Sequence, residues 1–271
     1  MSAKVEILLI GFGNMGQALV RGWLAKGRDP SSIQIVDPVP ASRAAAAQLG
    51  VSATGDVGAA AQAADVVVLA VKPNQVAEVL PRCAALARTG AVFLSIAAGK
   101  TIREIGSSLG ADARVVRAMP NTPAAIGRGI TALVANAAVS RGQRALCGEL
   151  LAAVGAIAWL DDERHMDAVT AISGSGPAYV FLLIECFELA AVELGLDAAL
   201  AKQLALATVA GASAYAADAQ ETPGELRRRV TSPKGTTQAA LDVLMAEPGM
   251  RELLARATQA AARRSRELAK A

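Results

Sequence analysis

Short apolar runs alternate with helical patterns over the first 160 residues, and this alternation constrains the fold more than any other feature of the sequence. Runs such as 5–10 and 66–71 are apolar at nearly every position, which is typical of strands buried on both faces. Because helical stretches separate these runs, the pattern predicts βαβ units and a mostly parallel, doubly wound sheet. The predicted strands are 5–10, 33–36, 66–71, 91–96, 114–118, 130–134 and 156–160, and the predicted helices are 14–26, 41–49, 75–88, 101–109 and 141–153.

The pattern changes at about residue 160, after which only helical periodicity is found. Helices are predicted over 161–195 and 197–218 and from about residues 237 and 250, with a turn at 221–224. Asp161 and Asp197 are candidate N-caps, because a short acidic side chain can accept a backbone N–H at a helix start. We therefore predict an α/β protein with a Rossmann-like doubly wound domain over residues 1–160 and an all-α domain over residues 161–271.

Composition excludes several classes of function. Aromatic residues make up 3% of the 271 residues, which is too few for a nucleic-acid surface built on stacked rings. The net charge of +3 is ordinary, and alanine accounts for much of the 53% hydrophobic content. Cys83, Cys147 and Cys186 lie far apart, so the sequence predicts neither a disulfide framework nor a metal site and favours a reducing compartment.

We expect a cytoplasmic protein with no membrane or nucleic-acid partner. An apolar run begins at residue 5, which leaves no room for a charged segment and a cleavage site before it. The most apolar later stretch, 178–196, carries Glu185, Glu188 and Glu193, and carboxylates make a membrane span costly.

The strongest local signal is a glycine-rich turn between the first predicted strand and the first predicted helix. In such a turn the first glycine permits the tight bend, the second lets the backbone approach a pyrophosphate, and the third lets helix and strand pack closely. The free N–H groups of the helix then bind the anion. The turn consists of Gly11, Phe12, Gly13, Asn14, Met15 and Gly16, and it predicts dinucleotide binding.

Polar or rigid groups follow three later strands, at the edge where doubly wound sheets bind their ligands. Asp37 is placed to bind a ribose 2′-hydroxyl and favours NAD, whereas Arg43 could bind a 2′-phosphate and favours NADP. The alternative is that Asp37 caps a helix and that Arg43 is an ordinary surface residue. The next strand ends in Ala70, Val71, Lys72 and Pro73. Lys72 is either a cofactor contact or an exposed loop residue. Asn121 lies between Pro120 and Pro123 in a loop that is either rigid scaffold or a cofactor contact.

Two motifs interrupt the helical part of the chain. Residues 173–177 read Ser-Gly-Ser-Gly-Pro. Glycine and proline destabilise the interior of a helix, so their presence here indicates either close packing or a functional site. Residues 230–237 place four hydroxyl side chains just before a helix, where carboxylates bind well. The single histidine, His165, is interpreted as a surface or capping residue. A general base has no obvious candidate in this sequence.

Together these motifs resemble the Δ1-pyrroline-5-carboxylate reductase family over nearly the whole chain. The residues that carry the resemblance are GFGNMG at 11–16, AVKP at 70–73, MPNTP at 119–123, SGSGPAY at 173–179 and VTSPKGTT at 230–237. The resemblance implies reduction of 1-pyrroline-5-carboxylate to L-proline, the last step of proline biosynthesis. It also implies NADPH as the expected cofactor with NADH as the alternative, and a homo-oligomer formed through the helical domain.

The resemblance also assigns roles to individual residues. Thr237 is expected to hydrogen-bond the ring nitrogen and to relay a proton, while Ser232, Gly235 and Thr236 bind the substrate carboxylate. Ala97, Gly99 and Asn121 are expected to line the cofactor crevice. The sequence departs from the family pattern at Lys234, where glycine is usual, and at Gln220, where the acidic residue is displaced to Glu221.

Two other classes of function are compatible with a dinucleotide-binding domain. The first is a different two-domain Rossmann reductase, of the β-hydroxyacid dehydrogenase or imine reductase type. A β-hydroxyacid dehydrogenase would need a catalytic lysine on a helix of the second domain, which Lys202 is poorly placed to supply. A non-catalytic dinucleotide-binding oligomer would leave the hydroxyl-rich loop at 231–237 unexplained.

Overall fold

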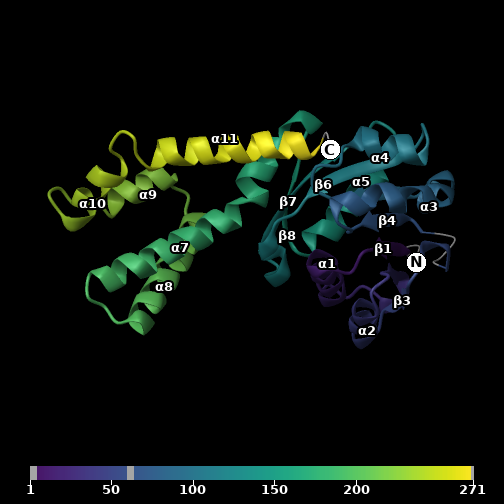
Figure 1. Cartoon of the computed structure of the whole chain (residues 1–271), viewed down its shortest axis with the longest axis horizontal. Coiled ribbons are helices and arrows are strands. Elements are labelled where there is room, and N and C mark those ends of the chain that lie inside the picture. Colours follow the sequence, from purple (N-terminus) through teal and green to yellow (C-terminus); the bar gives the residue numbers. More distant parts are fainter. Residues whose placement is uncertain (1–4, 60–63, 270–271) are drawn as a thin grey trace. The chain divides into compact units, whose positions relative to one another are not determined.

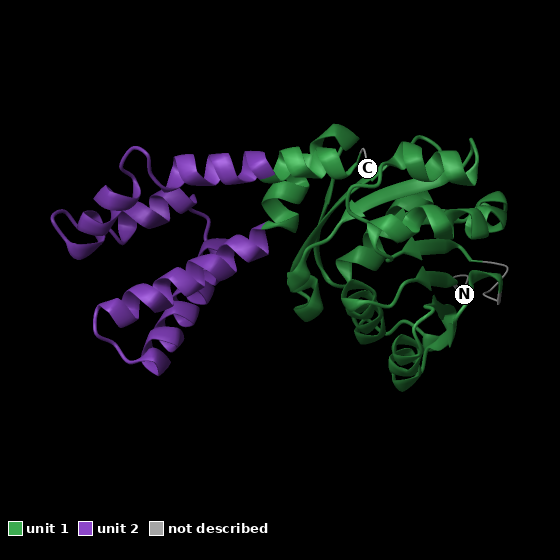
Figure 2. Cartoon of the chain, viewed as in Figure 1, with its two compact units in different colours: residues 1–175, 261–271 green, residues 176–260 purple. Residues whose placement is uncertain are grey.

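The computed structural model describes residues 5–59 and 64–269 and divides into two compact units (Figure 2). Unit 1 comprises residues 1–175 together with 261–271, and unit 2 comprises residues 176–260. Packing thus places the division later than residue 160, because the segment after the last strand still packs on unit 1. The boundary at residue 160, which was drawn from the sequence pattern, stays a prediction.

Unit 1 is built on an eight-stranded sheet in the order β3-β2-β1-β4-β5-β6-β7-β8 (Figure 1). Neighbouring strands are parallel except β6 and β7, which are antiparallel. The predicted doubly wound α/β fold is therefore confirmed. The strands are β1 (Ile7–Ile10), β2 (Ile33–Val36), β3 (Ser52–Thr54), β4 (Val66–Leu69), β5 (Val92–Ser95), β6 (Arg114–Met119), β7 (Gly129–Ala135) and β8 (Gly155–Trp159).

Helices cover both faces of this sheet, and each face has its own hydrophobic core. In β1, Ile7 and Leu9 belong to one core, whereas Leu8 and Ile10 belong to the other, as the two-residue period of a strand requires. The helices α1 (Asn14–Ala25), α2 (Pro40–Gln48) and α5 (Arg141–Ala152) contribute to the first core, and α3 (Val76–Arg88) and α4 (Ile102–Leu109) contribute to the second.

One edge strand was not predicted from the sequence. Strand β3 has the sequence Ser-Ala-Thr and pairs with β2, with Gln34 opposite Ser52. None of its residues is fully buried, so it lacks the apolar run that identified the other strands.

The segment that follows β8 contains two short turns of helix and an irregularity. Residues Glu163–His165 form a 3₁₀ turn, α6 spans Met166–Val169, and Thr170–Gly174 form a π-helical turn. The first cap is Asp162, whose side chain accepts the N–H of Arg164, and not Asp161 as predicted. His165 is exposed, as expected of a surface residue.

Unit 2 is entirely helical within the described residues. It contains α7 (Gly176–Glu193), α8 (Ala198–Asp218), α9 (Pro223–Arg229), α10 (Thr236–Leu244) and α11 (Met250–Leu268), whose last turns belong to unit 1. Asp197 caps α8, as predicted. The predicted turn at 221–224 is wrong, because Thr222 and Glu225 form a capping box and Pro223 begins a helix.

The helices α7 and α8 pack on each other but leave much of their apolar surface exposed. Phe181, Leu182 and Leu189 are 61%, 58% and 65% exposed, while only Ala201 and Ala205 of α8 are buried. Among the described residues, the helical stretch Glu163–Glu193 is long and apolar enough to cross a membrane on length and composition alone. A helix that is apolar on all sides requires another surface to cover it.

Candidate active site

The glycine-rich turn joins β1 to α1 at the point where the strand order reverses between β1 and β4 (Figure 1). Gly11 has φ +96°, and a Cβ atom there would lie 2.6 Å from the carbonyl oxygen of Ala70. A Cβ atom on Gly16 would lie 2.5 Å from the carbonyl oxygen of Gly11. Both positions therefore require glycine for backbone packing.

Gly13 differs from these two glycines, because a Cβ atom on it would meet nothing within 4 Å. Gly13 is the N-cap of α1, and neither a side-chain cap nor an acidic residue occupies the first turn. The open space and the uncapped N–H groups fit the pyrophosphate of a dinucleotide.

Asp37 follows β2 and is 7% exposed. Its Oδ2 accepts the N–H of Phe12 at 2.7 Å, and its Oδ1 accepts the N–H of Val39 at 2.9 Å. The carboxylate thus fastens the glycine turn to the end of β2, a role that the sequence analysis missed. Asp37 is not a helix cap, because the N-cap of α2 is Val39, which has no side-chain cap. The contact of Asp37 with a cofactor ribose stays a prediction.

Arg43 lies half-buried in α2 beside the same loop. Its Nη1 donates to the carbonyl oxygens of Asp37 at 2.9 Å and Pro38 at 2.8 Å. A guanidinium has five N–H donors, so these contacts leave others to bind an anion. Arg43 therefore lies at the end of β2, where the 2′-phosphate of NADP is expected.

The ends of β4 and β5 carry the other predicted cofactor residues. Ala70 and Val71 are half-buried, whereas Lys72 and Pro73 are exposed in the loop before α3. Ala97 is buried, and its N–H donates to the Ser95 hydroxyl at 3.3 Å. Gly99 has φ +76°, and a Cβ atom there would lie 3.6 Å from Leu268 near the end of α11.

Asn121 has a structural partner in the next strand. Its Oδ1 accepts the N–H of Ile130 at 2.9 Å, which fixes the loop between β6 and β7. This contact supports the rigid-scaffold alternative, although the amide NH₂ group keeps its donors. Gly174 packs close to this loop, since a Cβ atom on it would lie 2.5 Å from Cε of Met119. Packing against the end of the Met119 side chain therefore accounts for Gly174, whereas a Cβ atom on Gly176 would meet nothing within 4 Å.

In unit 2 the hydroxyl-rich loop lies directly before α10, with Gly235 as its N-cap. A Cβ atom on Gly235 would lie 2.5 Å from Oγ of Ser232 and 3.1 Å from its carbonyl oxygen, so glycine lets the Ser232 hydroxyl lie close to the start of α10. Thr236 and Thr237 are the first two residues of the helix. The structure thus brings the four predicted substrate residues to one helix N-terminus.

Lys234 has φ +60°, in the left-handed region that glycine adopts readily. The backbone therefore keeps the conformation that glycine would take, and the exposed lysine occupies it. Glu221 forms an ion pair with Arg229 across the two ends of α9.

The remaining reactive groups do not suggest another chemistry. Burial raises the pKa of the Cys83 thiol to about 11 and that of the Cys147 thiol to about 12, which disfavours the thiolate. Residues 5–59 and 64–269 contain no group of three His, Cys, Asp or Glu side chains that could hold a metal ion. A cavity of about 620 Å³ in unit 1 is lined by Trp23, Lys26, Arg28 and Glu149, and no predicted cofactor residue borders it.

The doubly wound sheet and the glycine turn at its switch point define the class of Rossmann-like dinucleotide-binding proteins. Comparison with known proteins narrows this class. A family model described as "NADP oxidoreductase coenzyme F420-dependent" matches residues 6–99, and one described as "Pyrroline-5-carboxylate reductase dimerisation" matches residues 163–268.

Relatives match over nearly the full length of the chain. The sequence is 43% identical to a pyrroline-5-carboxylate reductase of Pseudomonas aeruginosa over 97% of both chains, and 37% identical to one of Pisum sativum over 99% of this chain and 97% of the relative. The solved structure of a pyrroline-5-carboxylate reductase from Coxiella burnetii has a TM-score of 0.93 and 39% identity, covering 98% of each chain. The chain belongs to the pyrroline-5-carboxylate reductase family, as its motifs predicted.

Proposed function

We propose that this protein reduces the cyclic imine 1-pyrroline-5-carboxylate to L-proline. The single observation that carries the proposal is the full-length likeness to reductases of this name, at 43% identity over 97% of both chains. The hydroxyl-rich start of α10 supports it, because imine reduction needs the substrate carboxylate and ring nitrogen to be held.

The roles of the chain's own residues follow from their chemistry. When bound, NADPH or NADH supplies the hydride for the imine carbon. The N–H groups at the start of α10, with the Ser232 and Thr236 side chains, bind the substrate carboxylate. Thr237 Oγ1 accepts a hydrogen bond from the protonated ring nitrogen, which stabilises the protonated imine that accepts the hydride. No general base is needed, because hydride addition to a protonated imine removes no proton.

The experiment is a direct assay of turnover. The purified protein is mixed with 1-pyrroline-5-carboxylate and NADPH, or separately NADH, and nicotinamide absorbance is followed with formation of proline. We expect proline to form in step with cofactor oxidation, whereas no oxidation of either cofactor would contradict the proposal. A β-hydroxyacid supplied with NADP⁺ or NAD⁺, in place of the imine and the reduced cofactor, is the control for the dehydrogenase alternative.

We infer that NADPH is the preferred cofactor. A solved relative from Plasmodium falciparum, 26% identical over 98% of each chain with a TM-score of 0.85, was determined with NADP bound. In this chain the Asp37 carboxylate is engaged with backbone N–H groups, whereas Arg43 has donors left for a phosphate.

Replacing Arg43 with alanine tests this inference. We expect the KM for NADPH to rise about tenfold and that for NADH to change little, because only NADPH would lose a charge-assisted hydrogen bond. The measurement is a pair of steady-state titrations at saturating imine. Arg141→Ala, an exposed arginine of α5, is the matched control. Equal effects on both cofactors would remove Arg43 from the 2′-phosphate site.

We infer further that the protein is a homo-oligomer in which a second copy covers the exposed apolar surface of α7 and α8. The dimerisation family model spans these helices, and Phe181, Leu182 and Leu189 are more than half exposed. Glu185, also exposed on α7, makes a lipid environment costly. A monomeric mass by light scattering would contradict this inference.

A further inference from the structure

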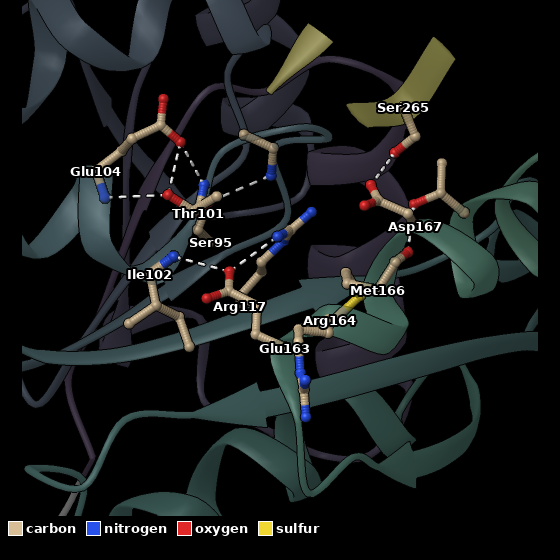
Figure 3. A network of polar contacts seen from close by, with 12 residues as sticks. Ser95, Thr101, Ile102, Glu104, Arg117, Glu163, Arg164, Met166, Asp167 and Ser265 are labelled. Carbon is tan, nitrogen blue, oxygen red and sulfur yellow. Dashed lines mark hydrogen bonds and ion pairs between the residues drawn. The ribbon is translucent and has the colours of Figure 1, made fainter. Parts of the chain in front are cut away.

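A buried cation lies beside the loop that joins β5 to α4. Arg117 of β6 is 5% exposed, and its Nη1 lies 2.8 Å from Oε1 of Glu163 (Figure 3). A buried charge is costly without a partner, so this ion pair satisfies a requirement of the fold. Glu163 comes from the 3₁₀ turn that follows β8, 46 residues further along the chain.

The same carboxylate oxygen has a second partner in a different segment. Glu163 Oε1 also accepts the N–H of Ile102 at 2.9 Å, and Ile102 is the first residue of α4 (Figure 3). The first N–H groups of a helix have no partner within the helix, so an acceptor from elsewhere fixes the helix start in place. One oxygen atom therefore connects β6, the start of α4 and the segment after β8.

These contacts bracket the loop of residues 96–101. At its first end, Ser95 pairs in register with Arg117, and the Ser95 hydroxyl accepts the N–H of Ala97. At its second end, Thr101 and Glu104 form a capping box, and Ile102 binds Glu163. The loop between these ends contains Ala97 and Gly99.

The position of this loop in the sheet determines which half of a dinucleotide it can contact. A dinucleotide lies across the switch point, with its adenosine half beside the acidic end of β2 and its other half over the strands beyond. Here Asp37 and Arg43 mark the adenosine side, and β4 and β5 lie on the far side of β1. The loop at 96–101 therefore borders the nicotinamide half.

We propose that Glu163 is a positioning residue for the nicotinamide half of the cofactor. By holding Arg117 and the Ile102 N–H with one oxygen, it fixes the loop that contains Ala97 and Gly99. The adenosine half binds at β1 and β2, which Glu163 does not contact. The proposal rests on the proposed function only through the identity of the cofactor.

The test compares two ligands that share the adenosine half. One is NADPH, and the other is 2′-phospho-ADP-ribose, which lacks the nicotinamide ring. In Glu163→Leu, which removes the acceptor oxygen, we expect the Kd of NADPH to rise at least about fivefold, while the Kd of the fragment stays within about twofold of the native protein. Binding is measured by calorimetry on the full-length protein, without the imine substrate. Failure of the proposed activity therefore does not affect this readout.

Two further variants separate positioning from stability. Glu149→Leu removes another arginine–carboxylate pair of unit 1, Arg28 with Glu149 at 2.9 Å, and should change neither Kd. Arg117→Met combined with Glu163→Met removes both charges, and such replacements often preserve stability. It still removes the acceptor for Ile102, so we expect near-native thermal unfolding together with the selective loss of NADPH affinity.

The outcomes that would overturn the proposal are equally specific. Unchanged binding of NADPH in Glu163→Leu would show that the loop does not depend on this carboxylate. Equal weakening of NADPH and the fragment would indicate a general structural role. Native NADPH affinity in the double variant would mean that the Ile102 contact does not position the cofactor.

Discussion

Replacing Gly13 with alanine is expected to weaken NADPH binding by roughly 100-fold without unfolding the protein. The added methyl group would meet no protein atom within 4 Å, and Gly13 has an ordinary φ of −72°. The space that it fills is the space in which a pyrophosphate must approach the N–H groups of α1. Calorimetric titration and thermal unfolding of the same sample measure both effects.

Gly13 is more informative than its two neighbours in the turn. Alanine at Gly11 or Gly16 would bring Cβ within about 2.6 Å of a backbone oxygen, so loss of binding there could follow from a disturbed fold. The matched control is Gly142→Ala in the first turn of α5, where a Cβ atom also meets nothing. This control should retain native affinity, and native affinity in Gly13→Ala would exclude the turn as the pyrophosphate site.

Replacing Thr237 with alanine is expected to lower kcat by about 100-fold and to leave the KM for NADPH within about twofold of its native value. The methyl group cannot accept a hydrogen bond from the ring nitrogen, whereas the cofactor residues of unit 1 are unaltered. Steady-state kinetics with each substrate varied in turn gives both constants.

Two variants make the Thr237 result specific. Thr237→Ser keeps the hydroxyl and should retain most of the turnover. Thr258→Ala removes the hydroxyl of a threonine in α11, which donates to a carbonyl of its own helix, and should be neutral. Native turnover in Thr237→Ala would show that its hydroxyl does not act on the ring nitrogen.

Most of the fold could be predicted because its signals are local. Seven of the eight strands were predicted from apolar runs, and the glycine turn was correctly placed between β1 and α1. Strand β3 was missed because its partly polar residues at a sheet edge bury little surface. Helix α9 was missed because Thr222 and Pro223 mark a helix start as readily as a turn.

In the candidate site, too, some residues could be predicted from the sequence, whereas a contact between distant residues could not. The residues before α10 were predicted because a run of hydroxyls before a helix is visible in the sequence. The contact of Asp37 with the Phe12 N–H was not predicted, although Asp37 itself was selected, because two different partners are compatible with a carboxylate at a strand end.

The sequence by itself determined the alternation of strands and helices, the glycine turn and the family to which the chain belongs. These depend on residues that are close together in the chain, where spacing alone fixes which backbone and side-chain groups can meet. Only the tertiary structure revealed that Glu163 binds Arg117 and Ile102, which lie 46 and 61 residues away. Such a contact leaves no periodicity in the sequence, because folding of the whole sheet is what brings the three segments together.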